Sequence, residues 1–239
     1  MIASSTLLAS NDYVGMTFWL ATAIMLASTV FFFVERSDVS GKWRTSMTVA
    51  GLVTGIAFWH YLYMRDAHIA SINGGEATTT VFRYIDWLIT VPLQIVEFYL
   101  ILAAVTAVTS MLFWRLLGAS LVMLIFGFLG EAGLMNVTVG FIIGMAGWIY
   151  IIYEIFAGEA AKLNEGSKNA GGQFAFNTLR YIVTIGWAIY PIGYFLGYMS
   201  GSETTDFGTV NIIYNIADLA NKTAFGLPIW AGATMDSSK

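Results

Sequence analysis

The sequence has 239 residues, of which 57% are hydrophobic and only 11% are charged, and its mean hydropathy is +0.70. A soluble domain is about 25% charged, so this composition excludes a water-soluble enzyme with one core and predicts a multi-pass protein of the lipid bilayer. The net charge of −4 disfavours nucleic-acid binding. With no cysteine and two histidines, the chain offers no disulfide, thiolate or histidine-rich metal site.

Seven segments contain the roughly 20 mostly apolar residues that a membrane-spanning helix requires. They cover residues 12–34, 43–65, 80–106, 112–135, 139–157, 176–199 and 208–232. We therefore predict an all-α fold, a seven-transmembrane-helix bundle that forms a single domain over residues 1–239. Continuous apolar runs such as 121–130 exclude the alternating pattern of a membrane β-barrel.

Polar and glycine-rich stretches separate the predicted helices. Such stretches occupy residues 40–41, 71–75, 164–172 and 200–202. The basic residues outside the spans fall on one side of the predicted topology, except for Arg65. They are Arg36, Lys42, Arg44, Arg115, Lys162, Lys168, Arg180 and Lys239. The positive-inside rule then places the C-terminus in the cytoplasm and the N-terminus outside.

Lys222 lies near the middle of the seventh predicted helix, where a charge needs a partner or a function. One interpretation is a structural ion pair with Asp218, which lies one turn earlier. The other is a lysine that forms a Schiff base with an aldehyde cofactor, for which a nearby carboxylate would be the counterion. The spacing alone leaves both interpretations open.

The third predicted helix carries the densest polar pattern, with Arg83, Asp86, Thr90 and Glu97. Asp86 and Glu97 are 11 residues apart, which places them ~20° apart around the helix and ~16.5 Å apart along it. The two carboxylates therefore share one face at two depths. They are either two independent helix-packing acids or members of a proton relay.

Aromatic residues gather on the third and sixth predicted helices. Trp187, Tyr190 and Tyr194 follow helical spacing and form one stripe, and Trp87 lies on the third helix. Most such stripes belong to a core or to an interfacial belt, but a flat conjugated ligand would also require aromatic walls.

Three stretches together resemble the microbial rhodopsins: residues 83–97, residues 187–191, and Asp218 to Lys222. Glu97, the Trp59–His60–Tyr61 sequence and the Gly130–Glu131–Ala132–Gly133 run are similar to the proteorhodopsin branch. The resemblance covers all seven predicted helices.

This resemblance implies all-trans-retinal bound covalently to Lys222 as a protonated Schiff base. By the same resemblance, Asp86 is the counterion and proton acceptor, Asp218 the second counterion, and Glu97 the proton donor. Arg83 would steer released protons, and Thr90 accompanies Asp86 and Glu97 in the motif. The residues expected to contact retinal are Trp87, Gln94, Met135, Trp148, Trp187, Tyr190, Pro191 and Tyr194.

Two assignments rest more strongly on the resemblance than on spacing. His60 would otherwise be a histidine that fills an interhelical gap, but proteorhodopsins pair it with the acceptor aspartate. It lies about five residues from the outer end of the predicted second helix. Gln94 would otherwise only bond a neighbouring helix, but glutamine at this position is typical of blue-absorbing members.

The function expected from the resemblance is light-driven outward proton pumping by a blue-absorbing transporter, not a conventional enzyme. The implied setting is a bacterial inner membrane, and the implied assembly is a homo-oligomer. A slow-cycling retinal-based light sensor is the alternative. Asp86 disfavours a chloride pump, and the set Asp86, Thr90 and Glu97 differs from that of sodium pumps. A receptor of the G-protein type is disfavoured because its Asp-Arg-Tyr signature is missing from the third helix.

Overall fold

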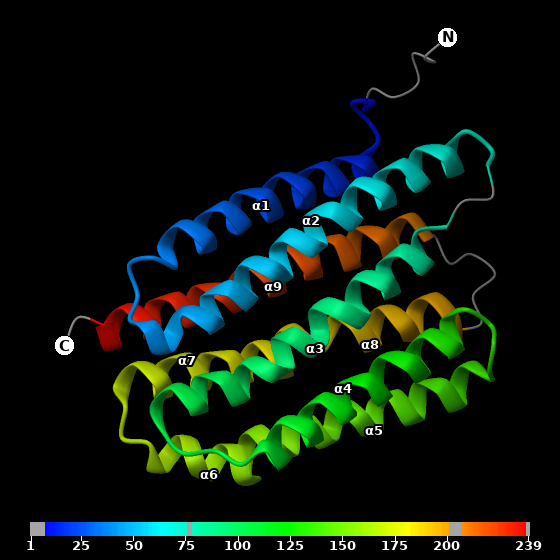
Figure 1. Ribbon diagram of the computed structural model, residues 1–239. Helices are drawn as coiled ribbons and strands as arrows, with labels where there is room; N and C mark the ends of the chain where they lie inside the picture. Colours follow the sequence, from blue (N-terminus) through cyan, green and yellow to red (C-terminus); the bar gives the residue numbers. More distant parts are fainter. Residues whose placement is uncertain (1–7, 76–77, 201–206, 238–239) are drawn as a thin grey trace.

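The computed structural model describes residues 8–75, 78–200 and 207–237, and helices in these ranges form seven long rods (Figure 1). The described residues contain no strand, so the predicted all-α class is confirmed. The first five rods are α1 (Tyr13–Glu35), α2 (Arg44–Ile72), α3 (Thr79–Val105), α4 (Ser110–Glu131) and α5 (Val137–Phe156). The sixth combines α7 (Ala170–Tyr181), η3 (Ile182–Gly186), α8 (Ile189–Tyr194) and η4 (Phe195–Met199), and the seventh is α9 (Phe207–Ser237).

Six of the described rods are long and apolar enough to cross a membrane. The exception, α9, has 31 residues, which is also sufficient length, but polar and charged side chains interrupt its middle. These are Asn215, Asp218, Asn221 and Lys222, all of them buried. The polar interruption of α9 therefore includes the buried lysine.

The predicted loops were partly wrong. α2 continues to Ile72, about two turns beyond the predicted end, so the 71–75 loop begins only at Asn73. The 164–172 stretch is mostly helical, since α6 (Glu159–Gly166) and the start of α7 occupy it. Ser200 follows the sixth rod as predicted, whereas Gly201 and Ser202, like Lys239, lie outside the described residues.

α4 ends at Glu131, four residues before the predicted end. Gly133 adopts a φ of 70°, a left-handed conformation that terminates helices, and the Leu134 amide donates back to the Leu129 carbonyl at 2.9 Å. This early end places the Glu131 side chain at the last turn of the helix.

The sixth rod changes its winding twice. It passes from α-helix into a π-helical turn at Ile182–Gly186 and again at Phe195–Met199. The Asn221 amide of α9 donates to the Gly186 carbonyl at 3.0 Å, so the neighbouring rod satisfies a carbonyl at the first irregular turn. π-Helical turns are frequent at functional sites, and this one directly precedes Trp187.

The rods pack in sequence order into a closed ring, with α9 against α1, α2 and α7. α1 begins and α9 ends at opposite ends of the bundle (Figure 1). We call the end near Asp12, Thr79 and Glu131 the N-terminal face, and the end near Val105 and Ser237 the C-terminal face. α3 runs from the first to the second, so Arg83, Asp86 and Glu97 lie at increasing distance from the N-terminal face.

Candidate functional site

Lys222 of α9 lies in the middle of the bundle between two carboxylates. Its Nζ donates a hydrogen bond to Asp86 Oδ2 of α3 and lies 3.4 Å from Asp218 Oδ2. The lysine side chain is 2% exposed, and both carboxylates are fully buried. A buried cation of this kind requires such pairing, because burial removes the water that would otherwise stabilise its charge.

The two carboxylates differ in how they are held. Asp218 accepts hydrogen bonds from Tyr61 Oη at 2.9 Å, Trp87 Nε1 at 3.0 Å and Tyr190 Oη at 2.8 Å. In contrast, Asp86 Oδ1 has no hydrogen-bond partner among the described residues. Donors stabilise an ionised carboxylate, and Asp218 is held by three donors while one oxygen of Asp86 has none among the described residues.

Arg83 lies one turn from Asp86 toward the N-terminal face. Its guanidinium is 3.7 Å from Asp218 Oδ2 and donates to Asn215 Oδ1 at 2.9 Å and to Asn211 Oδ1 at 3.1 Å. The group is 2% exposed. The site around Lys222 therefore contains two cations and two anions, and its formal charges balance.

His60 and Thr90 both lie beside Asp86. His60 Nδ1 lies 3.7 Å from Asp86 Oδ1, which is within ion-pair distance, and donates its hydrogen bond to the Ile56 carbonyl at 2.9 Å. His60 also lies 12 residues before the end of α2, not five, which places it at mid-depth in the bundle. Thr90 Oγ1 donates to the Asp86 backbone carbonyl at 3.0 Å.

Glu97 lies on the other side of Lys222, toward the C-terminal face. It is fully buried, and neither of its carboxyl oxygens has a hydrogen-bond partner among the described residues. Ser46 of α2 is its polar neighbour, and the Ser46 hydroxyl is equally without a partner there. A carboxylate in this setting would carry a large desolvation cost, so Glu97 is expected to hold a proton.

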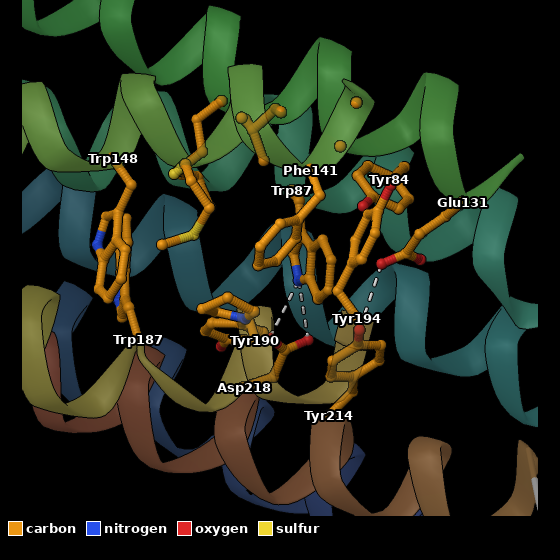
Figure 2. Close-up of a pocket in the computed structure, with 18 of the residues that line it drawn as sticks. Tyr84, Trp87, Glu131, Phe141, Trp148, Trp187, Tyr190, Tyr194, Tyr214 and Asp218 are labelled. Carbon is orange, nitrogen blue, oxygen red and sulfur yellow. Dashed lines mark hydrogen bonds between the residues drawn. The ribbon is translucent and has the colours of Figure 1, made fainter. Parts of the chain in front are cut away.

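A largely apolar cavity extends from Lys222 between α3, α4, α5 and the sixth rod. Figure 2 shows Trp148 and Trp187 at one end, Trp87 and Tyr190 in the middle, and Tyr194 with Glu131 at the other end. Of the residues we expected to contact a ligand, the cavity is lined by Trp87, Gln94, Trp148, Trp187, Tyr190, Pro191 and Tyr194. Met135 does not line it, because α4 ends before Met135; Met123 and Met145 provide the methionine side chains instead.

Several residues of the site were missed at the sequence level. Tyr61 donates to Asp218, and Asn211 and Asn215 hold Arg83. The two asparagines could have been found, because residues 211, 215, 218 and 222 follow one another at helical spacing and form a polar stripe on one face of α9. Tyr61 was noted only as part of the Trp59–His60–Tyr61 sequence, and its spacing gave no sign of a contact with Asp218.

Comparison with known proteins identifies the family. The model of the bacteriorhodopsin-like protein family matches residues 12–235. The chain belongs to this family. Rhodopsins of this family bind retinal.

The chain is similar to proteorhodopsins of both colours. It is 58% identical to the blue-light absorbing proteorhodopsin of Gamma-proteobacterium Hot 75m4 over 95% of this chain and 89% of that protein. It is 57% identical to the green-light absorbing proteorhodopsin of Gamma-proteobacterium EBAC31A08 over 96% of this chain and 90% of that protein. The crystal structure of blue light-absorbing proteorhodopsin from Med12 superposes with a TM-score of 0.78 at 63% identity, covering 94% and 99% of the two chains. Overall identity therefore does not decide the colour.

The residues present fit retinal. A flat, conjugated aldehyde needs a primary amine and apolar walls. Lys222 supplies the amine, while Trp87, Trp187 and Tyr190 supply walls of the cavity (Figure 2). The carboxylates of Asp86 and Asp218 lie where a positive charge on Lys222 Nζ requires them.

Proposed function

We propose that this protein is a light-driven outward proton pump that carries all-trans-retinal on Lys222. The observation that carries the proposal is the placement of Lys222 Nζ against Asp86, with Glu97 farther along the same helix toward the C-terminal face. A proton held at Lys222 therefore has a carboxyl group on each side of it.

When bound, retinal supplies light absorption and an isomerisation that changes the direction and the proton affinity of Lys222 Nζ. The chain supplies everything that gives the movement a direction. Trp87, Trp187 and Tyr190 hold the ligand and exclude water. Lys222 Nζ holds the proton that is to be moved.

Asp86 is the acceptor. Its Oδ2 already accepts a hydrogen bond from Lys222 Nζ, so a proton that leaves the nitrogen has a short path to it. Asp218 is the less suitable acceptor, because three donors already hold its carboxylate. Asp218 therefore remains the anion that balances Arg83, while Asp86 binds the proton.

Glu97 is the donor. It lies ~16.5 Å along α3 from Asp86, on the opposite side of Lys222 from Arg83. An isolated, buried carboxyl group is suited to hold a proton until Lys222 Nζ needs one. It then takes up another proton from the C-terminal face.

The positive-inside rule supports the outward direction. Arg36, Lys42 and Arg115 lie at the C-terminal face, whereas Arg65 lies toward the N-terminal face. The C-terminal face is then cytoplasmic, so protons enter past Glu97 and leave past Asp86. In a bacterial host, the corresponding location is the inner membrane.

A slow-cycling light sensor is the less favoured function. A sensor requires no fast proton supply, yet Glu97 stands at the supply position as a fully buried carboxyl group. The similarity to proteorhodopsins along nearly the whole chain supports the pump as well.

The test is light-driven pH change in a suspension of retinal-supplied cells, which should acidify the medium until an uncoupler abolishes the signal. Asp86→Asn should abolish the signal and move the absorption maximum to longer wavelength, because it removes a negative charge next to the cation on Lys222. Sustained outward pumping by Asp86→Asn would contradict the assignment. Bound pigment without any pH change in the native protein would favour the sensor.

A further inference from the structure

A second cavity opens toward the N-terminal face, and we call it the N-terminal vestibule. Arg83 forms its inner wall, and Thr79 and Asn211 lie farther out. The complete lining is Ala67, His68, Ser71, Thr78, Thr79, Thr80, Arg83, Glu131, Tyr198, Val210, Asn211 and Tyr214. Because Arg83 also lies beside Asp218, the vestibule begins where the site around Lys222 ends.

Glu131 lies at the boundary between the two cavities. Glu131 and Tyr214 line both the cavity beside Lys222 and the N-terminal vestibule. Figure 2 shows the Glu131 side chain directed toward the ring of Tyr214, with Tyr84 beside it. The proposed proton path through Asp86 and Glu97 does not use this carboxyl group.

Hydroxyl groups surround the Glu131 carboxyl group. Tyr214 Oη donates to Glu131 Oε1 at 3.3 Å, and the hydroxyls of Tyr84 and Tyr198 face the same carboxyl group. The guanidinium of Arg83 lies over the Tyr214 ring, 5.3 Å from its centre. Arg83 and Tyr214 therefore connect Glu131 to the polar groups around Asp218.

We propose that Glu131 passes the outgoing proton from the Asp86 side of the site into the N-terminal vestibule. This inference rests on the proposed pumping function and adds an exit residue to it. In each cycle Asp86 loses one proton and regains its negative charge. Glu131 binds one proton and releases one to the vestibule, so its own charge is unchanged at the end.

The outer part of the vestibule also offers a proton-binding pair. His68 is buried, and its Nε2 lies 3.1 Å from Asp12 Oδ1 at the start of α1.

The alternative for Glu131 is a purely structural hydrogen bond that links α4 to α9 through Tyr214. Such a structural link requires a hydrogen-bond acceptor but no exchangeable proton, and this difference can be measured.

The experiment compares Glu131→Gln with native protein, both loaded with retinal in lipid vesicles and excited by a flash. The glutamine keeps the acceptor oxygen for Tyr214 but cannot exchange a proton. We expect deprotonation of Lys222 Nζ and its reprotonation from Glu97 to keep their native rates. Loss of the proton from Asp86 should slow on the order of tenfold or more. The infrared band of the protonated Asp86 carboxyl group measures this step.

Two further variants separate an exit role from a structural one. Glu131→Asp keeps a titratable group and should restore most of the native rate. Glu154→Gln, which alters another buried glutamate at the C-terminal face, should leave every step unchanged.

Each remaining outcome decides against a specific claim. A native rate of proton loss from Asp86 in Glu131→Gln would overturn the exit role, as would equal slowing in Glu131→Asp and Glu131→Gln. If native vesicles moved no protons in light at all, the proposed pumping function would fail instead.

Discussion

The bundle has different polarity on the two sides of Lys222. Toward the N-terminal face, Arg83, Asp218 and their neighbours form a continuous hydrogen-bonded network that reaches the vestibule. Toward the C-terminal face, Glu97 has no hydrogen-bond partner among the described residues. Apolar residues such as Ile95 and Phe98 are fully buried in that region.

This difference suggests how one lysine could move protons in one direction. A proton that leaves Lys222 Nζ enters a region in which carboxylates and hydroxyls can bind it. On the other side a proton meets mostly apolar packing around Glu97 and Ser46, which disfavours return flow. The asymmetry of the protein, rather than the ligand, would therefore set the direction.

Lys222 lies at the centre of this asymmetry, and its removal should have the largest effect. Lys222→Ala eliminates the buried amine, so we expect complete loss of colour when retinal is added, measured as the visible absorption spectrum of purified protein. Lys162→Ala, which removes a lysine at the C-terminal face, should remain coloured. A coloured adduct of Lys222→Ala that borohydride traps would disprove the attachment site.

The second test makes the C-terminal side unable to supply a proton. Glu97→Gln keeps the shape of the side chain but has no proton to give. Reprotonation of Lys222 Nζ should slow by about 10²–10⁴-fold, the usual effect of removing a positioned proton donor. Flash spectroscopy measures this as the decay of the deprotonated state, whose formation should be unaffected. Glu154→Gln is the control and should keep the native decay. An unchanged decay in Glu97→Gln would show that the donor lies elsewhere.

Apolar runs were sufficient to predict the seven rods, because each span must be long and apolar to cross a bilayer. They failed where the helix leaves the hydrocarbon. The last turns of α2 contain Asp66, His68 and Ser71, so hydropathy ended this helix too early. The irregular turns of the sixth rod were not predictable either, since no proline marks Ile182–Gly186.

The polar residues of the site were easier to predict than its contacts. Asp86, Glu97, Asp218 and Lys222 were identifiable because charged residues are costly in a membrane. Met135 was placed in the cavity by resemblance alone, and the left-handed Gly133 that ends α4 moves it out. The hydrogen bonds that distinguish Asp218 from Asp86 depend on Tyr61 and Tyr190, which come from two other rods and could not be deduced from spacing.

The third test changes a neighbour of Asp86, and a smaller effect is expected. His60 Nδ1 is 3.7 Å from the oxygen of Asp86 that has no hydrogen-bond partner among the described residues. A polar side chain this close acts on the charge of Asp86, so His60→Ala should move the midpoint of the acid-induced colour change by on the order of one pH unit. Spectra recorded across a pH series measure that midpoint. An unchanged midpoint would leave His60 with a packing role only.

The smallest expected effect concerns Gln94, between the two sides. Its side chain lines the cavity and is 1% exposed, and its Nε2 has no hydrogen-bond partner among the described residues. A buried amide without a partner is costly, which favours a role toward the ligand over a bond to a neighbouring helix. The amide dipole would stabilise the ground-state charge distribution of bound retinal more than that of the excited state.

We therefore expect a blue-absorbing pigment, and Gln94→Leu should absorb at longer wavelength with retinal still attached. Gln173→Leu, outside the cavity, should leave the spectrum unchanged. Identical spectra for native protein and Gln94→Leu would instead assign Gln94 a structural role. Because the sequence identity to blue-absorbing and green-absorbing relatives is similar, other residues of the cavity would then have to determine the colour.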